Sequence, residues 1–200
     1  MTTRMLPRLG AGCGAVFSVA LFAAHGNGNP GYARTVVGLF ALAFFLPFLA
    51  YLCSLLREAE GENGWLATTA FAAGLTGITI KLMSGAPEIA YRHVADRTPA
   101  HRALEGIAEG ATVISLYPLA ALLAVVAVLT FRTGVLPRWL GLGAALTAIA
   151  LAINGGFIHA ENMPGLLLFV LWTLVASIVL FRRTQGEPAR ATRARSAATT

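Results

Sequence analysis

His101, Glu105 and Glu109 are spaced four residues apart, and all three are of types that take part in acid–base chemistry or metal binding. Because each residue of an α-helix advances about 100° around the axis, successive members of this set differ by about 40°. The three side chains therefore share one stripe of a predicted helix. Thr98 and Pro99 lie just upstream as its predicted N-cap and first-turn residues. A position near a helix N-terminus also favours a carboxylate for electrostatic reasons alone.

Lys81 is the only lysine of the chain and lies near the end of the apolar stretch 65–83. The next apolar stretch returns from that end, so the Lys81 ammonium could meet Glu105 or Glu109. A charged group among apolar helices needs a partner or water. The alternative is that Lys81 extends its flexible stem to the polar edge of the apolar layer. Both placements of Lys81 stay open at this point.

Further ionisable and amide side chains fall on the same side of the predicted helices as Lys81. Glu88 follows the third apolar stretch, Asn154 lies near the end of the fifth, and His159 and Glu161 come after it. We interpret these residues as a candidate polar basin. Its predicted members are Lys81, Glu88, His101, Glu105, Glu109, Asn154, His159 and Glu161.

Three chemical uses of this polar basin are open. Histidines and carboxylates could bind a divalent metal such as Zn²⁺, with His101, Glu105 and His159 as the candidate ligands. A histidine–carboxylate set could instead relay protons, or the basin could bind a small polar solute. The chain contains no His-Glu-x-x-His, no closely spaced cysteine pair and no phosphate-binding glycine loop. The sequence therefore assigns no catalytic residue and predicts no cofactor, and histidines in loops are commonly only solvated.

The composition shows which elements must position these side chains. Of 200 residues, 56% are hydrophobic and only 12% are charged, and the mean hydropathy is +0.70. A soluble chain has about 25% charged residues, because its folded surface meets water. Most side chains of this protein must therefore contact lipid or other helices, and we predict an all-α integral membrane protein. The net charge of +6 reflects arginine beside the membrane rather than a nucleic-acid surface, because no basic segment is interleaved with aromatics.

Six apolar stretches predict a six-helix transmembrane bundle within a single domain, residues 1–181. A helix needs about 20 apolar residues to cross the hydrocarbon core. The predicted spans are 9–24, 35–56, 65–83, 103–131, 139–158 and 165–181. The first and last of these are short for a crossing. Pro47 and Pro118 lie inside the second and fourth spans and are expected to kink them.

The first predicted span has a second interpretation. Arg4 and Arg8 precede a short apolar core, which is also the pattern of a secretory signal peptide. No clear small-residue cleavage site follows this core, so we expect a helix that is retained in the bundle.

Small residues four apart within the spans would let neighbouring helices approach closely, since helices in lipid associate through packing and polar contacts. The spaced pairs are Gly10 with Gly14, Ala70 with Gly74, Ala73 with Gly77 and Gly141 with Ala145. They favour a compact bundle without specifying which helices meet. Trp65-Leu66 and Trp139-Leu140 each follow a short loop at the start of a span, where tryptophan suits the headgroup boundary.

The arginines indicate how the spans are oriented, because short cytoplasmic loops are enriched in Lys and Arg. With the N-terminus inside, ten arginines fall in inner segments: Arg4, Arg8, Arg57, Arg132, Arg138, Arg182, Arg183, Arg190, Arg193 and Arg195. Four fall in outer segments: Arg34, Arg92, Arg97 and Arg102. We therefore expect a cytoplasmic-membrane protein with both termini in the cytoplasm and the polar basin outside. Residues 182–200, rich in Ala, Arg and Thr without apolar periodicity, predict a disordered basic cytoplasmic tail.

Three short segments carry a resemblance to a known group of proteins. They are Gly64-Trp65-Leu66-Ala67, Gly85-Ala86-Pro87-Glu88 and Leu136-Pro137-Arg138-Trp139-Leu140-Gly141. In these segments, and over most of its length, the chain resembles small multi-spanning actinobacterial membrane proteins of uncharacterised function. The resemblance implies an actinobacterial origin and a helical bundle. It implies no active residue, because the shared segments are turns beside spans.

These observations support three hypotheses about function. The first is a non-enzymatic membrane protein with an accessory or structural role, whose partners are membrane lipids and either a second copy of the chain or another membrane subunit. The second is a small-solute or proton-coupled transporter that uses the polar basin and the proline-containing helices. The third is an outward-facing, metal-dependent membrane enzyme. We favour the first, because the sequence contains no catalytic or cofactor motif, and we expect no nucleic-acid partner.

Overall fold

The structure is a computed structural model that describes residues 5–25, 32–62, 64–96, 98–157 and 164–197. The described residues form seven α-helices and no strand. The helices are α1 (Met5–His25), α2 (Tyr32–Glu60), α3 (Trp65–Met83), α4 (Gly85–Tyr91), α5 (Pro99–Thr133), α6 (Arg138–Phe157) and α7 (Pro164–Ala197). This arrangement confirms the predicted all-α fold.

Six segments of the described chain are long and apolar enough to cross a membrane. They are Leu6–Ala24, Thr35–Glu60, Trp65–Tyr91, Pro99–Thr133, Arg138–Gly156 and Pro164–Thr184. The first and last, predicted to be short, reach 19 and 21 residues because the helices begin earlier or end later than the apolar run alone indicates. The short helix α4 continues the third span. The six-helix membrane bundle is thus confirmed.

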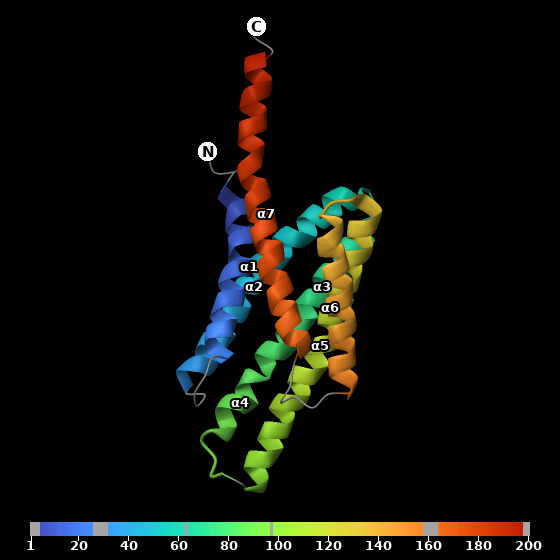
Figure 1. Ribbon diagram of the computed structural model, residues 1–200. Coiled ribbons are helices and arrows are strands. Elements are labelled where there is room, and N and C mark those ends of the chain that lie inside the picture. The colour runs from blue at the N-terminus through green and yellow to red at the C-terminus, as the bar shows by residue number, and fades with distance from the viewer. Residues whose placement is uncertain (1–4, 26–31, 63, 97, 158–163, 198–200) are drawn as a thin grey trace.

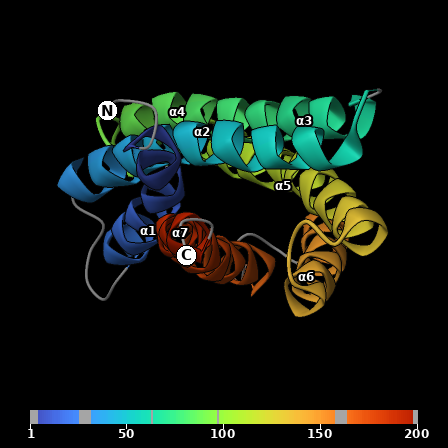
Figure 2. The same cartoon turned by 90° about the horizontal axis from the view of Figure 1, so that it is seen from above.

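The long helices close into a ring in which each contacts its neighbour along the chain (Figures 1 and 2). α1 packs on α2, α2 on α3, α3 on α5, α5 on α6 and α6 on α7, and the contact of α7 with α1 closes the ring. α4 also packs on α5. Each long helix therefore packs against at least two other helices and keeps part of its surface exposed.

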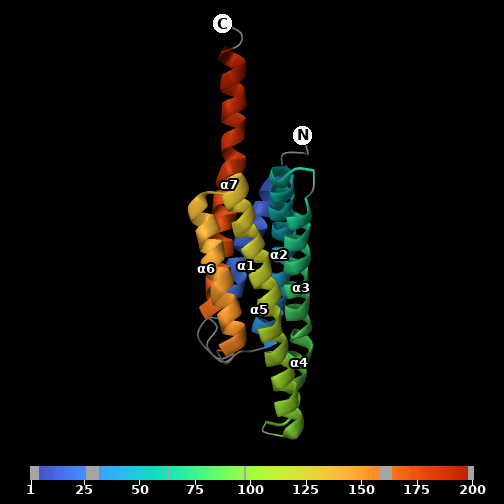
Figure 3. The same cartoon turned by 90° about the vertical axis from the view of Figure 1, so that its right-hand side faces the viewer.

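The two ends of the bundle differ in what they contain (Figures 1 and 3). The start of α1, the end of α7 and the α2–α3 and α5–α6 connections lie at one end, which we call the arginine-rich end. α4 and the start of α5 extend at the other, which we call the α4 end. The termini thus share one end, as an even number of crossings requires.

α5 has well-defined boundaries and is the longest of the described helices. The Thr98 hydroxyl accepts a hydrogen bond from the backbone N–H of His101 at 3.1 Å, which confirms the predicted N-cap. Gly134 ends the helix in the left-handed conformation, with φ 68°. At about 1.5 Å per residue, its 35 residues extend about 50 Å.

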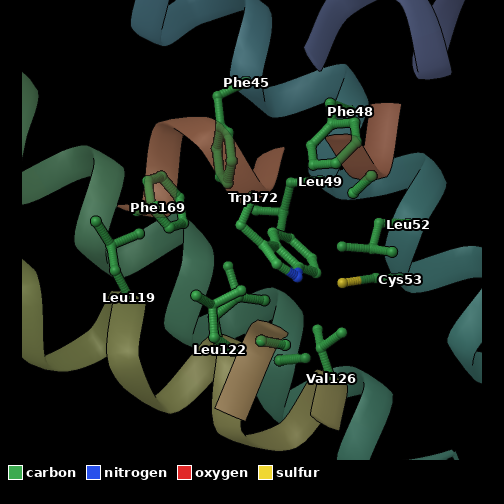
Figure 4. Packing of buried hydrophobic residues seen from close by; sticks show 14 of the residues in the cluster. Phe45, Phe48, Leu49, Leu52, Cys53, Leu119, Leu122, Val126, Phe169 and Trp172 are labelled. Atoms are coloured by element: carbon green, nitrogen blue, oxygen red, sulfur yellow. The ribbon is translucent and has the colours of Figure 1, made fainter. Parts of the chain in front are cut away.

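Aromatic and aliphatic side chains fill the interior of the ring. The ring centroids of Phe17 and Phe45 lie 5.1 Å apart, and Phe169 lies 5.5 Å from Phe45, so α1, α2 and α7 meet through aromatic rings. Figure 4 shows Trp172 of α7 among buried side chains from α2 and α5. The Trp172 indole N–H donates to the carbonyl oxygen of Leu140 at 3.0 Å, which satisfies its one polar group.

The spaced glycines allow close contact between specific helices. A Cβ atom on Gly14 of α1 would lie 2.5 Å from the Phe48 ring of α2, and one on Gly74 of α3 would lie 2.7 Å from Leu49. One on Gly141 of α6 would lie 2.7 Å from Thr130 of α5. The small residues that favoured a compact bundle therefore sit at helix contacts, and the structure supplies the partners that the sequence left open.

Two features of the helices bear on earlier expectations. Pro47 and Pro118 lie inside α2 and α5, and both helices continue through them. α7 continues to Ala197, and the disorder expected of residues 182–200 stays a prediction. Once a helix has formed, each added residue gains a hydrogen bond without the cost of nucleation, and Ala and Arg are good helix formers. The long apolar part of α7 supplies that nucleus.

Gly14→Ala should destabilise the bundle, whereas Gly12→Ala in the same helix should not. The new methyl group at position 14 would meet the Phe48 ring, and relieving such a clash costs about 1–3 kcal/mol. A Cβ on Gly12 meets nothing within 4 Å, so that change gains up to about 1 kcal/mol of helix propensity. Thermal unfolding in detergent measures the difference. Equal melting temperatures for the two variants would contradict this packing.

Candidate functional site

The predicted members of the polar basin come from four helices. Lys81 lies on α3, Glu88 on α4, Asn154 on α6, and His101, Glu105 and Glu109 on α5. His159 and Glu161 lie outside the residues that the structure describes. The contacts of the described members fall into separate groups rather than one.

The first group joins α2 to α4 through Thr35. The Thr35 hydroxyl donates to Oε1 of Glu88 at 3.0 Å and accepts from Nη2 of Arg92 at 2.9 Å. Arg92 also pairs with Glu88 one turn earlier, at 3.6 Å. Because Thr35 is buried and the two charged groups are partly buried, the three side chains form a shielded hydrogen-bonded network. Glu88 therefore joins α4 to α2 through the Thr35 hydroxyl.

The second group joins α3 to α5 through Lys81. The Lys81 ammonium donates to the Thr112 hydroxyl at 2.7 Å, and that hydroxyl donates in turn to the carbonyl oxygen of Ala108 at 3.0 Å. Thr112 lies one turn beyond Glu109 on α5 and is buried. Lys81 is only partly exposed, so it packs against α5 instead of extending freely to the surface.

The third group joins α4 to α5 through His101. Nδ1 of His101 lies 3.1 Å from the carbonyl oxygen of Tyr91, and the two rings meet edge to face with centroids 5.2 Å apart. Asp96 lies 4.0 Å from the same nitrogen and is almost fully exposed. His101 therefore holds the turn between α4 and α5. Glu105 and Glu109, which follow it along the predicted stripe, are exposed.

Asn154 contacts a different pair of helices. Its Oδ1 accepts a hydrogen bond from the backbone N–H of Gly165 at 3.0 Å, in the first turn of α7. It thereby satisfies one of the N–H groups that a helix start leaves without an intrahelical partner. Asn154 is 1% exposed, and its Nδ2 has no hydrogen-bond partner among the residues that the structure describes. Asn154 thus acts as a cap between α6 and α7, whereas Lys81 acts between α3 and α5.

Within the described part of the chain, no cluster of side chains supports the metal hypothesis. Among those residues, no three His, Cys, Asp or Glu side chains gather closely enough to hold a metal ion. His101 instead directs Nδ1 at a backbone carbonyl. A metal site that uses His159 lies outside the described residues and stays a prediction.

Sequence reasoning missed Thr35, Arg92 and Thr112, which supply the partners of the predicted charges. Arg92 follows Glu88 by four residues, and that spacing is a recognisable signal for an ion pair on a helix. Thr112 follows Glu109 by three residues, so it could have been placed on the same helix face. Thr35 lies more than fifty residues from its partners and has no local signal.

Six helices of membrane-spanning length, closed into a ring with charged side chains at its ends, define a multi-pass integral membrane protein. No protein-family model, no curated protein and no solved structure matches the chain. The fold and the contacts described above therefore carry the functional argument alone.

Thr35→Val should destabilise the α4 end, because it leaves Glu88 and Arg92 without the hydroxyl that joins them. Removing one partner of a partly buried hydrogen bond costs about 1–3 kcal/mol. The free energy of unfolding in a detergent–urea titration measures the loss. Thr69→Val is the matched control, since Thr69 is exposed and bonds only to the backbone of its own helix. If both variants lose the same free energy, the network does not hold the helices.

Proposed function

We propose that this integral membrane protein has an accessory or structural role rather than a catalytic one. The observation that supports the proposal is the use of its polar side chains. Thr35 with Glu88 and Arg92, Lys81 with Thr112, and His101 with Tyr91 each join one helix to another. Polar contacts of this kind hold helices together where water is scarce. Side chains that bond to a neighbouring helix in this way stabilise the helix bundle.

The proposed orientation places the arginine-rich end in the cytoplasm and the α4 end outside, in the cytoplasmic membrane. The unequal distribution of arginine between the two ends supports it, since arginine in short loops is retained on the cytoplasmic side. The kinship with uncharacterised actinobacterial membrane proteins rests on the three segments quoted above and is part of the same proposal.

A transporter for protons or small solutes is the second candidate, and the position of Lys81 favours it. Lys81 lies inside the third membrane-length segment, and its ammonium is held between two helices. An ionisable residue inside a span often marks a path for ions or substrate. Thr112 would then hold Lys81 in place for exchange with a passing solute or proton.

Flux measurements on vesicles separate the two candidates. For an accessory protein, proton and chloride flux should be the same in protein-free vesicles and in vesicles with wild type or Lys81→Met. Lys81→Met should instead speed hydrogen exchange in the facing ends of α3 and α5, because their shared contact is lost. Flux that wild type supports, that Lys81→Met abolishes and that Lys81→Arg partly restores would replace the accessory role with transport.

A further inference from the structure

Five exposed arginines lie together at the arginine-rich end. They come from three parts of the chain: α1, the ends of the α5–α6 connection, and α7. We call this set, which consists of Arg8, Arg132, Arg138, Arg182 and Arg183, the arginine patch; all five side chains are exposed. None of these five arginines takes part in the helix contacts described above for the α4 end.

Two hydrogen bonds bring the parts of the arginine patch together. The Arg183 guanidinium donates to the carbonyl oxygen of Val135, which lies between Arg132 and Arg138 in sequence. Nη2 of Arg8 lies 3.5 Å from the carbonyl oxygen of Thr184, next to Arg183. The acceptors are neutral carbonyls, so these two hydrogen bonds neutralise neither guanidinium.

The elements that carry the arginine patch contain one carboxylate near it, Glu187, which follows Arg183 by four residues on α7. Residues 5–25, 110–157 and 164–184 contain no Asp or Glu. The other acids at this end, Glu58, Glu60 and Glu62, belong to the α2–α3 connection or the end of α2. Glu60 is already used, because its two carboxylate oxygens accept from the N–H groups of Leu66 and Ala67 at 3.0 and 2.8 Å. The patch therefore carries an excess of positive charge, with five arginines against Glu187 on the elements that form it.

The start of α6 strengthens the attraction for an anion. A helix N-terminus carries a partial positive charge and favours acids in its first turn, yet α6 begins with Arg138 and has no acid there. α3 begins at the same end of the bundle and receives the Glu60 carboxylate. No described residue supplies a side-chain carboxylate to the start of α6. Of these two helix starts, the described residues provide a carboxylate only to that of α3.

The aromatic neighbours of the arginines indicate the depth of the patch. Phe131 precedes Arg132, Phe181 precedes Arg182, and Trp139 follows Arg138; their exposed fractions are 51%, 38% and 56%. Exposed aromatic rings beside arginine mark the boundary between hydrocarbon and headgroups. The guanidinium groups therefore lie at the level where phospholipids carry their phosphates.

We propose that the arginine patch binds the phosphate of an anionic phospholipid headgroup. The planar guanidinium groups of Arg132, Arg138 and Arg183 match phosphate oxygens in pairs, as arginine does wherever phosphate is recognised. The positive start of α6 lies beside Arg138 and adds backbone donors. A headgroup without net charge would bind less tightly, because the excess of arginine in the patch would also repel its cationic group.

Binding of lipid to the purified full chain tests the proposal. Wild type in neutral detergent is titrated with short-chain phosphatidylglycerol and with short-chain phosphatidylcholine, and affinity is read from the rise in melting temperature. We expect tighter binding of phosphatidylglycerol, with affinity reduced ~5-fold in each of Arg132→Gln, Arg138→Gln and Arg183→Gln. Arg138→Lys keeps the charge but loses the paired guanidinium contact, so its loss of affinity should be smaller than that of Arg138→Gln. Arg102→Gln, at the α4 end, removes an exposed arginine outside the patch and is the matched control.

Each alternative outcome contradicts the proposal. Equal affinity for the two lipids would show that the headgroup charge is not recognised. An equal loss in Arg102→Gln would show that only the net charge of the protein matters. Stabilisation by inorganic phosphate as strong as that by phosphatidylglycerol would replace the lipid with a free anion. Circular dichroism and size-exclusion chromatography of each variant ensure that a loss of affinity is not a loss of fold.

Discussion

Close approach between helix backbones is the contact on which the ring of helices depends. Between helices in lipid there is little hydrophobic driving force, so association relies on packing and polar contacts over short distances. Gly14 admits the Phe48 ring, Gly74 admits Leu49, and Gly141 admits Thr130. The aromatic cluster of α1, α2 and α7 and the polar contacts of the α4 end then form between helices that are already near.

The polar side chains follow from the same constraint. A charge or hydroxyl between helices cannot be left to water, so it takes a partner from the neighbouring helix. Lys81 takes Thr112, and Glu88 takes Thr35 and Arg92. Asn154 accepts from the start of α7 through its side-chain oxygen, while its buried amide nitrogen has no partner within the described part of the chain. The described side chains that the sequence suggested as one polar basin are thus distributed over several separate helix contacts.

The fold was largely predictable, and the site only in part. Hydropathy over each span is a local property, so the six segments and the N-cap at Thr98 could be found from the sequence. The disorder expected of residues 182–200 stays a prediction, although α7 extends to Ala197. For Lys81 the sequence left open a carboxylate on the next span or the polar edge, and the hydrogen-bond acceptor in the structure is Thr112 of α5. Thr35 depends on a tertiary contact with no local signal.

The length of α5 sets how this protein meets its surroundings. A helix of about 50 Å is much longer than the roughly 30 Å of hydrocarbon that it crosses. Its first turns carry the exposed Glu105 and Glu109 and pack against α4 at the α4 end of the bundle (Figure 3). The start of α5 therefore presents charged side chains at one end of the bundle. An antibody, a protease or an impermeant label directed at this segment would report which side of the membrane it faces.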